Sequence, residues 1–184
     1  MKNAIILHGT DATSKDNWFP WLKKELESDG WDVWVPDLPK ANKPNSKRYN
    51  TFLFSKKELH LNDETVMIGH SSGAVAILGF LQQLPDDVVI KRIILAGAFK
   101  NDLGWDSLKE MFVEPLDFQK IKKHVKEITL LHADNDPYIP IEQAEFLTEQ
   151  LDGELIILSG QKHFSESMDP KYNKFPFIAE LLKD

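Results

Sequence analysis

The chain has 184 residues, of which 42% are hydrophobic and 28% are charged, and these proportions are ordinary for a globular protein. Its net charge of −7 argues against a surface for nucleic acid or for anionic lipid. The absence of cysteine excludes disulfides, thiol catalysis and cysteine-held zinc. The first apolar run, residues 4–7, is too short for a signal peptide, and no run reaches the ~18 residues of a membrane span. We therefore expect a single domain over residues 1–184, located in the cytoplasm, without nucleic-acid or membrane partners.

Short apolar runs alternate with longer amphipathic runs along the chain, which is the pattern of β-α units on a parallel sheet. Strands are predicted at residues 3–8, 31–36, 64–69, 90–96, 127–132 and 154–158. Helices are predicted near residues 18–29, 46–60, 72–84, 107–124, 141–151 and 174–183, with Asn17 as the N-cap of the first. Most of the strands are continuous apolar runs, as expected where helices cover both faces of a sheet. The predicted fold class is an α/β three-layer sandwich with a mainly parallel six-stranded sheet.

The third predicted strand runs directly into the sequence Gly69-His70-Ser71-Ser72-Gly73, which fits the G-x-S-x-G pattern of a nucleophile elbow. In such a turn the backbones of the strand and the helix nearly touch, so a side chain at either glycine would block it. We expect Ser71 to adopt a positive φ, a strained conformation that proteins keep mainly at functional sites. A glycine-rich turn before a helix can also cradle a phosphate, so the motif needs partners elsewhere in the chain.

Candidate partners follow the carboxyl ends of later strands, where sites form in doubly wound sheets. Asp134 and Asp136 follow the fifth strand and His163 follows the sixth, which is the chain order Ser…Asp…His of the α/β-hydrolase arrangement. His163 would accept the proton of Ser71, and an aspartate would orient and stabilise the imidazole ring. Both aspartates remain candidates, although the prolines after Asp136 would hold its loop rigid and favour it.

An acyl-transfer site also needs hydrogen-bond donors for the oxyanion, and the backbone N–H groups of Thr10 and Ser72 are the candidates. Trp18, Phe99 and Trp105 are candidate residues of a substrate pocket, with packing in the core as the alternative for these aromatic side chains. Residues 98–118, between the fourth and fifth strands, are predicted to form a small cap-like insertion that shapes this pocket, or else simply to pack.

Several motifs together resemble the small serine hydrolases of the retinoblastoma-binding-protein/YdeN type, which are compact members of the α/β-hydrolase superfamily. These motifs are His8-Gly9, Trp18-Phe19-Pro20-Trp21, Gly69-His70-Ser71-Ser72-Gly73, Asp136-Pro137-Tyr138-Ile139-Pro140 and His163-Phe164. The resemblance spans nearly the whole chain. It implies a six-stranded parallel sheet of strand order 2-1-3-4-5-6 and a catalytic triad of Ser71, Asp136 and His163. The chain departs from this family where Gln161-Lys162 replaces a Gly-Gly pair before the histidine, so that loop is expected to be stiffer or differently placed.

The leading hypothesis is a serine hydrolase that cleaves a small carboxylic ester or amide through an acyl-enzyme and needs neither a cofactor nor a metal. One alternative is a catalytically silent hydrolase fold that serves as a protein-interaction module. A second is a metal-dependent hydrolase, because imidazole and carboxylate groups suit zinc or manganese. Its ligands would come from His8, His70, His132, His163, Asp134 and Asp136. Structural roles are the simpler interpretation of His8 and His70, the first in tying down its own loop by hydrogen bonds.

Overall fold

Six parallel strands form one sheet in the computed structural model, which describes residues 1–183. The strands are β1 (Asn3–Leu7), β2 (Asp32–Trp34), β3 (Thr65–His70), β4 (Ile90–Ala96), β5 (Val125–Ala133) and β6 (Glu154–Leu158). Their order, β2-β1-β3-β4-β5-β6, and their parallel pairing confirm the predicted sheet. Every residue of β1 and β3 is buried, because helices cover both faces of these central strands.

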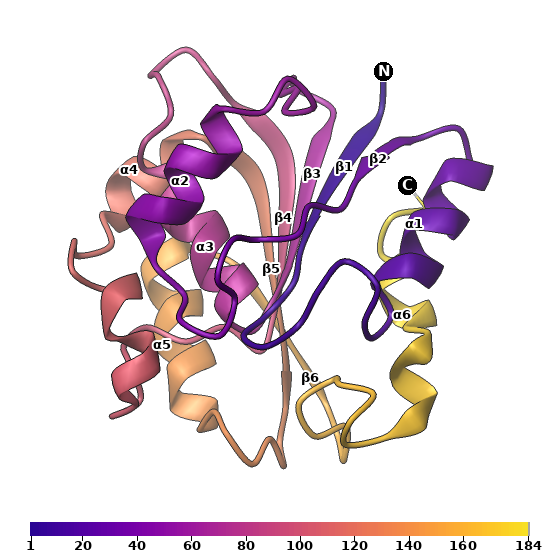
Figure 1. Cartoon of the computed structure of the whole chain (residues 1–184), viewed down its shortest axis with the longest axis vertical. Coiled ribbons are helices and arrows are strands. Elements are labelled where there is room, and N and C mark those ends of the chain that lie inside the picture. Colours follow the sequence, from indigo (N-terminus) through magenta and orange to yellow (C-terminus); the bar gives the residue numbers. More distant parts are fainter. Residues whose placement is uncertain (184) are drawn as a thin grey trace.

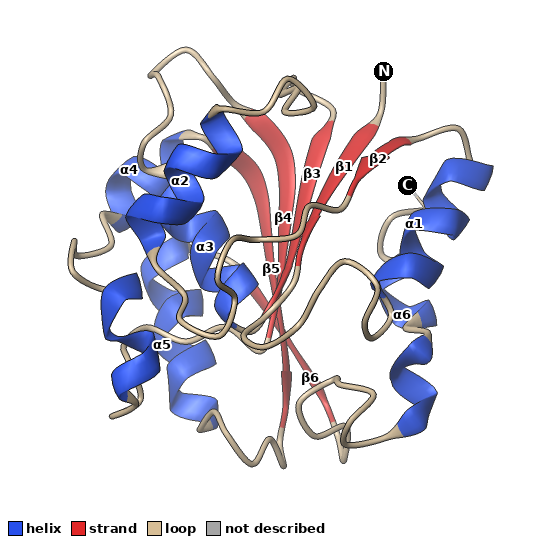
Figure 2. Cartoon of the chain, viewed as in Figure 1, coloured by secondary structure: helices blue, strands red, loops and turns tan. Residues whose placement is uncertain are grey.

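Helices lie on both faces of this sheet and complete the three layers (Figure 1). They are α1 (Phe19–Ser28), α2 (Ser46–Phe54), α3 (Ser72–Leu81), α4 (Phe118–Lys123), α5 (Ile141–Leu151) and α6 (Pro176–Glu180), with the 3-10 helices η1 (Asp106–Met111) and η2 (Pro170–Asn173). Figure 2 shows α1 and α6 on one side of the sheet and α2, α3, α4 and α5 on the other. Each side has its own apolar core, so the sheet is packed on both faces. Within residues 1–183, none of the helices combines the length and the hydropathy that a membrane span requires.

The helix predicted over residues 107–124 is instead two short helices, η1 and α4, with a loop between them. Pro115 lies in that loop, and its missing N–H and fixed φ prevent a helix from continuing through it. Helix α4 begins shortly after Pro115, because the Asp117 carboxylate accepts the backbone N–H of Lys120 at 3.0 Å and caps this helix. Residues 98–118 therefore contain one turn-like helix and irregular chain rather than a long helix.

Other differences lie at the ends of elements. The strand predicted at 31–36 pairs with β1 over only three residues, Asp32–Trp34, and Pro36 beyond it has no N–H to donate to a sheet. The second predicted helix ends at Phe54 rather than near residue 60. The last predicted helix is divided into η2 and α6, and α6 begins with Pro176, a residue that the first turn of a helix accommodates.

The prediction of Asn17 as the N-cap of α1 is wrong. Trp18 occupies the N-cap position, and Asn17 has a left-handed backbone with φ 51°. The side-chain oxygen of Asn17 accepts the backbone N–H of Glu166 at 2.8 Å. Asn17 thus fastens the loop after β1 to the loop after β6, and both of these loops border the candidate site.

Candidate active site

Ser71 stands at the sharp turn between β3 and α3, as the elbow motif predicts. Its backbone has φ 55° and ψ −125°, so the expected positive φ is confirmed. The backbone N–H of Ser71 donates to the carbonyl oxygen of Ala96 at 2.8 Å, at the end of the neighbouring strand β4. The strained turn is therefore held from both sides, by its own helix and by the adjacent strand.

Steric contact explains both glycines of the elbow. A Cβ atom added to Gly69 would lie 2.5 Å from the Cα atom of Ala74 in α3. A Cβ atom added to Gly73 would collide with the carbonyl oxygens of Leu7 and His8 at the end of β1. The close approach of strand and helix that the motif predicts is thus confirmed, and the first turn of α3 also rests directly on β1.

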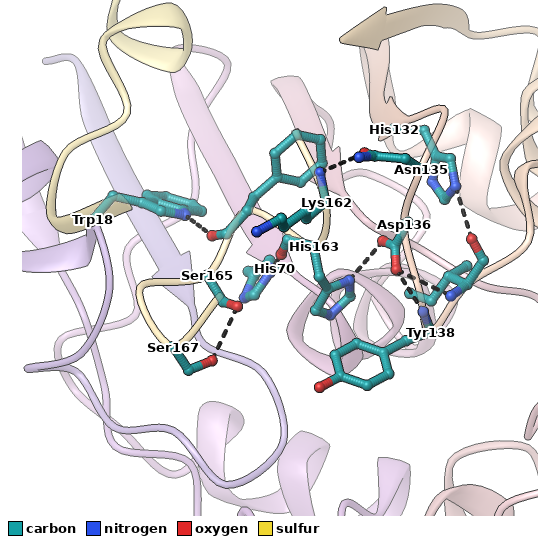
Figure 3. Close-up of polar contacts among 12 residues, drawn as sticks. Trp18, His70, His132, Asn135, Asp136, Tyr138, Lys162, His163, Ser165 and Ser167 are labelled. Carbon is teal, nitrogen blue, oxygen red and sulfur yellow. Dashed lines mark hydrogen bonds and ion pairs between the residues drawn. The ribbon is translucent and has the colours of Figure 1, made fainter. Parts of the chain in front are cut away.

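Asp136 and His163 meet at the carboxyl edge of the sheet, although they come from the loops after β5 and β6. Nδ1 of His163 donates to Oδ2 of Asp136 at 2.7 Å (Figure 3). The other carboxylate oxygen accepts the backbone N–H groups of Tyr138 at 2.9 Å and Ile139 at 3.1 Å. Because the proton is held on Nδ1, Nε2 of His163 is the nitrogen left free to accept another proton.

The environment of Asp136 favours its ionised form. Its side chain is fully covered, and this burial alone would raise the pKa of the carboxyl group. The hydrogen bond to His163, the charge of that ring and the two backbone N–H donors outweigh burial and hold the pKa below its ordinary value. A carboxylate that stays ionised can orient an imidazole and stabilise the imidazolium that forms on it.

Asp134, the competing acid, does not contact His163. Its Oδ2 accepts the hydroxyl of Ser159 at 2.7 Å and its Oδ1 accepts the backbone N–H of Gly160 at 2.8 Å. These two contacts hold the turn that follows β6. The backbone N–H of Gly160 and the Ser159 hydroxyl also lower the pKa of Asp134. Asp134 therefore shapes the approach to the histidine loop, whereas Asp136 binds the ring itself.

The histidine loop has Gln161-Lys162 where the family resemblance leads us to expect a Gly-Gly pair, yet it brings His163 to Asp136. Lys162 adopts the left-handed region with φ 54°, a conformation that glycine reaches at less cost. Its backbone N–H donates to the side-chain oxygen of Asn135 at 2.8 Å. The side-chain oxygen of Gln161 accepts the Tyr172 hydroxyl at 2.7 Å. Side-chain hydrogen bonds thus hold this loop in place.

The loop after β1 is fixed by His8, as its structural interpretation predicts. Nδ1 of His8 donates to the carbonyl oxygen of Gly9 at 2.9 Å, and Nε2 accepts the backbone N–H of Leu38 at 2.8 Å. These two partners require the neutral tautomer with its proton on Nδ1. Burial lowers the pKa of His8, which agrees with this neutral form.

Thr10 and Ser72, the candidate oxyanion residues, touch each other across the elbow. The Thr10 hydroxyl donates to the Ser72 hydroxyl at 2.9 Å, which joins the loop after β1 to the start of α3. Among residues 1–183, no acceptor is found for the backbone N–H group of either residue. Both groups are therefore available to bind an oxyanion, and that of Ser72 lies at the positive end of the α3 dipole.

The alternative metal site is not formed by the described residues. Within residues 1–183, no three histidine, aspartate or glutamate side chains gather in a way that could hold a metal ion. The proposed ligands are instead engaged in hydrogen bonds with other groups of the protein or, for His163 and Asp136, with each other. His132, for example, donates from Nε2 to the carbonyl oxygen of Ile139 at 3.0 Å, and Asp134 binds the turn after β6.

A cavity of about 690 Å³ opens above the elbow, and Ser71 and His163 both border it. Phe99, Trp105 and other apolar side chains of residues 98–118 form part of its wall. Trp18 does not border the cavity, so the alternative of core packing holds for this residue. It is fully buried and donates from Nε1 to the carbonyl oxygen of Phe164 at 3.1 Å (Figure 3).

Three residues of the site were not predicted from the sequence. The ring of Tyr138 stands edge-on to that of His163 at a centroid distance of 5.2 Å. Gly97 has φ 62°, and a Cβ atom there would lie 3.1 Å from Cε1 of His163. Asn135 holds the histidine loop through Lys162. All three follow the carboxyl end of β4 or β5, and that position is the signal that could have found them.

Comparison with known proteins agrees with this geometry. A family model described as serine hydrolase matches residues 4–184. The protein YdeN of Bacillus subtilis (strain 168) is 30% identical over 183 residues, which cover 98% of this chain and 94% of YdeN. The serine hydrolase RBBP9 of Rattus norvegicus is 27% identical over 170 residues, which cover 89% of this chain and 88% of RBBP9.

Solved structures share the same architecture. The crystal structure of YdeN from B. subtilis matches with a TM-score of 0.88 and 28% identity, covering 99% of this chain and 97% of that one. Est1E of Butyrivibrio proteoclasticus, in a structure with ferulic acid bound, matches with a TM-score of 0.70 and 18% identity, covering 100% and 90%. At that identity Est1E shows the common fold alone. Because the family model spans nearly the whole chain, the protein belongs to the serine hydrolase family and is an enzyme of the α/β-hydrolase fold.

Proposed function

We propose that this enzyme hydrolyses a small carboxylic ester or amide through an acyl-enzyme formed on Ser71, with Asp136 and His163 completing the triad. The observation that carries the proposal is the 2.7 Å hydrogen bond between His163 and the covered carboxylate of Asp136. His163 borders the same cavity as Ser71, a serine held at positive φ on a nucleophile elbow. The three residues have the chain order and the roles that acyl transfer requires.

In the proposed reaction, Oγ of Ser71 attacks the carbonyl carbon of the substrate while Nε2 of His163 takes its proton. Asp136 stabilises the imidazolium that forms. The N–H groups of Thr10 and Ser72 receive the negative charge that develops on the carbonyl oxygen. His163 then gives the proton to the departing alcohol or amine. A water molecule then gives a proton to Nε2 of His163 and attacks the acyl-enzyme. The acid is released when the bond to Oγ of Ser71 breaks and Oγ takes the proton back from His163.

The cavity supports a small-molecule substrate with an apolar part. Its volume of about 690 Å³ lies in the range of pockets that enclose small ligands. We propose that residues 98–118 act as a small cap over this pocket, with Phe99 and Trp105 beside the acyl or leaving group. A series of p-nitrophenyl esters of graded acyl length, assayed beside aminoacyl amides, would measure the preferred acyl group.

A fluorophosphonate probe tests the nucleophile directly. We expect a covalent adduct on the peptide that contains Ser71, and no adduct in the Ser71→Ala variant. Ser165 also borders the cavity, so Ser165→Ala is the matched control and should still be labelled at Ser71. His163→Ala should lower kcat/KM by about three orders of magnitude or more, since the triad acts as a unit. Labelling that survives Ser71→Ala would overturn the proposal.

A further inference from the structure

His70 is the last residue of β3 and immediately precedes Ser71. Its side chain is buried and its ring lies near the rings of Trp18, Phe19 and His163. The centroids of the two imidazole rings are 4.9 Å apart. This histidine is therefore adjacent to the proposed nucleophile in sequence and to the proposed base in space.

One hydrogen bond joins the elbow to the backbone of the base. Nε2 of His70 lies 2.7 Å from the carbonyl oxygen of His163. A carbonyl oxygen can only accept, so the proton of His70 is on Nε2. Burial, with a smaller contribution from His163, lowers the pKa of His70 to about 3, so this neutral donor persists across the working pH range of most enzymes.

The position of His163 depends on such contacts because its loop has little regular structure of its own. Lys162 and Phe164, the residues on either side of it, both have left-handed backbones. The bond to Asp136 holds the ring from the loop after β5, but this bond does not itself hold the backbone of His163. The bond from His70 holds this backbone from β3, the strand that also carries Ser71. Together the two bonds set the direction from Nε2 of His163 toward Ser71.

We propose that His70 is a positioning residue. It fixes the position of the general base His163 relative to Ser71, because it binds the backbone carbonyl of His163 and is itself the residue next to Ser71. This inference rests on the proposed function of Ser71 and His163. Misplacement of a reacting group by about 1 Å can cost about 100-fold in rate, so a single anchor at this position is expected to have a large effect.

The structure offers a matched control one residue further along. The carbonyl oxygen of Phe164 accepts the indole N–H of Trp18 at 3.1 Å. This bond is also buried and also ties the histidine loop to the scaffold. This bond comes from the start of α1 rather than from the elbow. Its loss should therefore destabilise the fold without changing the position of His163 relative to Ser71.

Three variants test the proposal with a p-nitrophenyl ester, by comparing kcat, KM, the rate of fluorophosphonate labelling and Tm. His70→Leu removes the donor, and we expect kcat and the labelling rate to fall about 10- to 100-fold with KM changed less than about threefold. His70→Gln keeps an N–H donor and should recover at least about tenfold of a 100-fold loss. Trp18→Phe should lower Tm while kcat stays within about threefold. If His70→Leu does not fold, the more adaptable His70→Met takes its place.

Three results would overturn the inference. They are a kcat within threefold of the parent in the donor-less variant, a His70→Gln variant as slow as the donor-less one, and an equal loss of kcat in Trp18→Phe. Ser71→Ala and His163→Ala, measured in the same series, separate the two proposals. If these variants abolish labelling and turnover while His70→Leu keeps kcat within threefold of the parent, the positioning role alone fails. If they keep full activity, the proposed function fails as well.

Discussion

Two carboxylates only two positions apart do different work in the loop after β5. Asp136 has one oxygen on the ring of His163 and the other on two backbone N–H groups of its own loop. Asp134 has both oxygens on the turn after β6. Both pKa values are lowered, so both groups are ionised at neutral pH. Contact with the imidazole, rather than charge, is what distinguishes them.

We predict that Asp136→Asn lowers kcat/KM by about 10³- to 10⁴-fold, because a neutral amide cannot stabilise the imidazolium and can select the wrong tautomer. Asp134→Asn, the matched control, keeps an oxygen for the turn after β6 and should retain kcat/KM within about tenfold. Ester hydrolysis by the two variants and the parent measures the difference. A larger loss in Asp134→Asn than in Asp136→Asn would contradict the assignment.

The sequence could predict the residue types of the site better than their contacts. Ser71 carries a local steric signature in its two flanking glycines, and the acid and histidine later in the chain favoured a nucleophile over a phosphate cradle. The preference for Asp136 rested on its prolines and on the family resemblance. The bond between His70 and His163 joins residues 93 positions apart, and no local pattern encodes it. Trp18 could have faced either the cavity or the core, and only the packing of α1 decides between them.

Among the elements, the junction of β3 and α3 is where packing and chemistry constrain each other most. The first turn of α3 rests on the end of β1, which is also the start of the loop that carries Thr10. Gly73 allows this approach. A Cβ atom added to Gly79 in the same helix would lie 3.4 Å from Oγ of Ser46, which is an ordinary contact. The two glycines of α3 therefore serve different purposes.

We predict that Gly73→Ala lowers the free energy of unfolding by about 3 kcal/mol or more, because the new methyl group overlaps two backbone carbonyls that cannot yield. Gly79→Ala should change it by less than about 1 kcal/mol, with a gain expected because alanine favours a helix interior. Urea unfolding of both variants, followed by circular dichroism, gives the comparison. Equal stabilities would show that α3 can move away from β1.

The order and direction of the strands could be predicted, whereas the ends of the helices could not. Continuous apolar runs mark β3, β4 and β5 because both faces of the sheet are covered. The strand order came from the family resemblance. The helix predicted through Pro115 shows the weakness of periodicity alone, since its apolar residues are buried in η1 and α4 on either side of a break.

Over the whole molecule, several imidazole rings are buried in neutral form. His8, His70 and His132 all have pKa values lowered by burial, and that of His70 falls to about 3. In the unfolded chain such groups titrate near pH 6.5. Below that pH the unfolded chain binds more protons than the folded one, so the free energy of unfolding falls as the pH falls. Asp136, with its lowered pKa, keeps its contribution until the pH drops below the ordinary aspartate range.

We predict that the free energy of unfolding decreases between pH 7 and pH 5 by at least about 2 kcal/mol. His70 alone contributes this amount, because one buried neutral imidazole costs about 1.4 kcal/mol for each pH unit below 6.5. Urea unfolding at pH 7, 6 and 5 measures this slope. His70→Gln removes one buried imidazole. The free energy of unfolding of this variant should therefore change less steeply with pH, by an amount that corresponds to at most one bound proton. A parent protein whose stability is flat over this range would contradict the buried neutral state.

The order along the chain of the three residues proposed as the triad has a consequence for synthesis of the polypeptide. Ser71 leaves the ribosome long before β6 and His163 exist, and Asp136 emerges between them. If these residues act as proposed, a nascent chain carries Ser71 before it has His163 to accept the proton of Ser71. Under the proposed mechanism, hydrolytic activity arises only when β6 pairs with β5 and the loop after β6 brings His163 to Asp136, so activity is acquired late in synthesis.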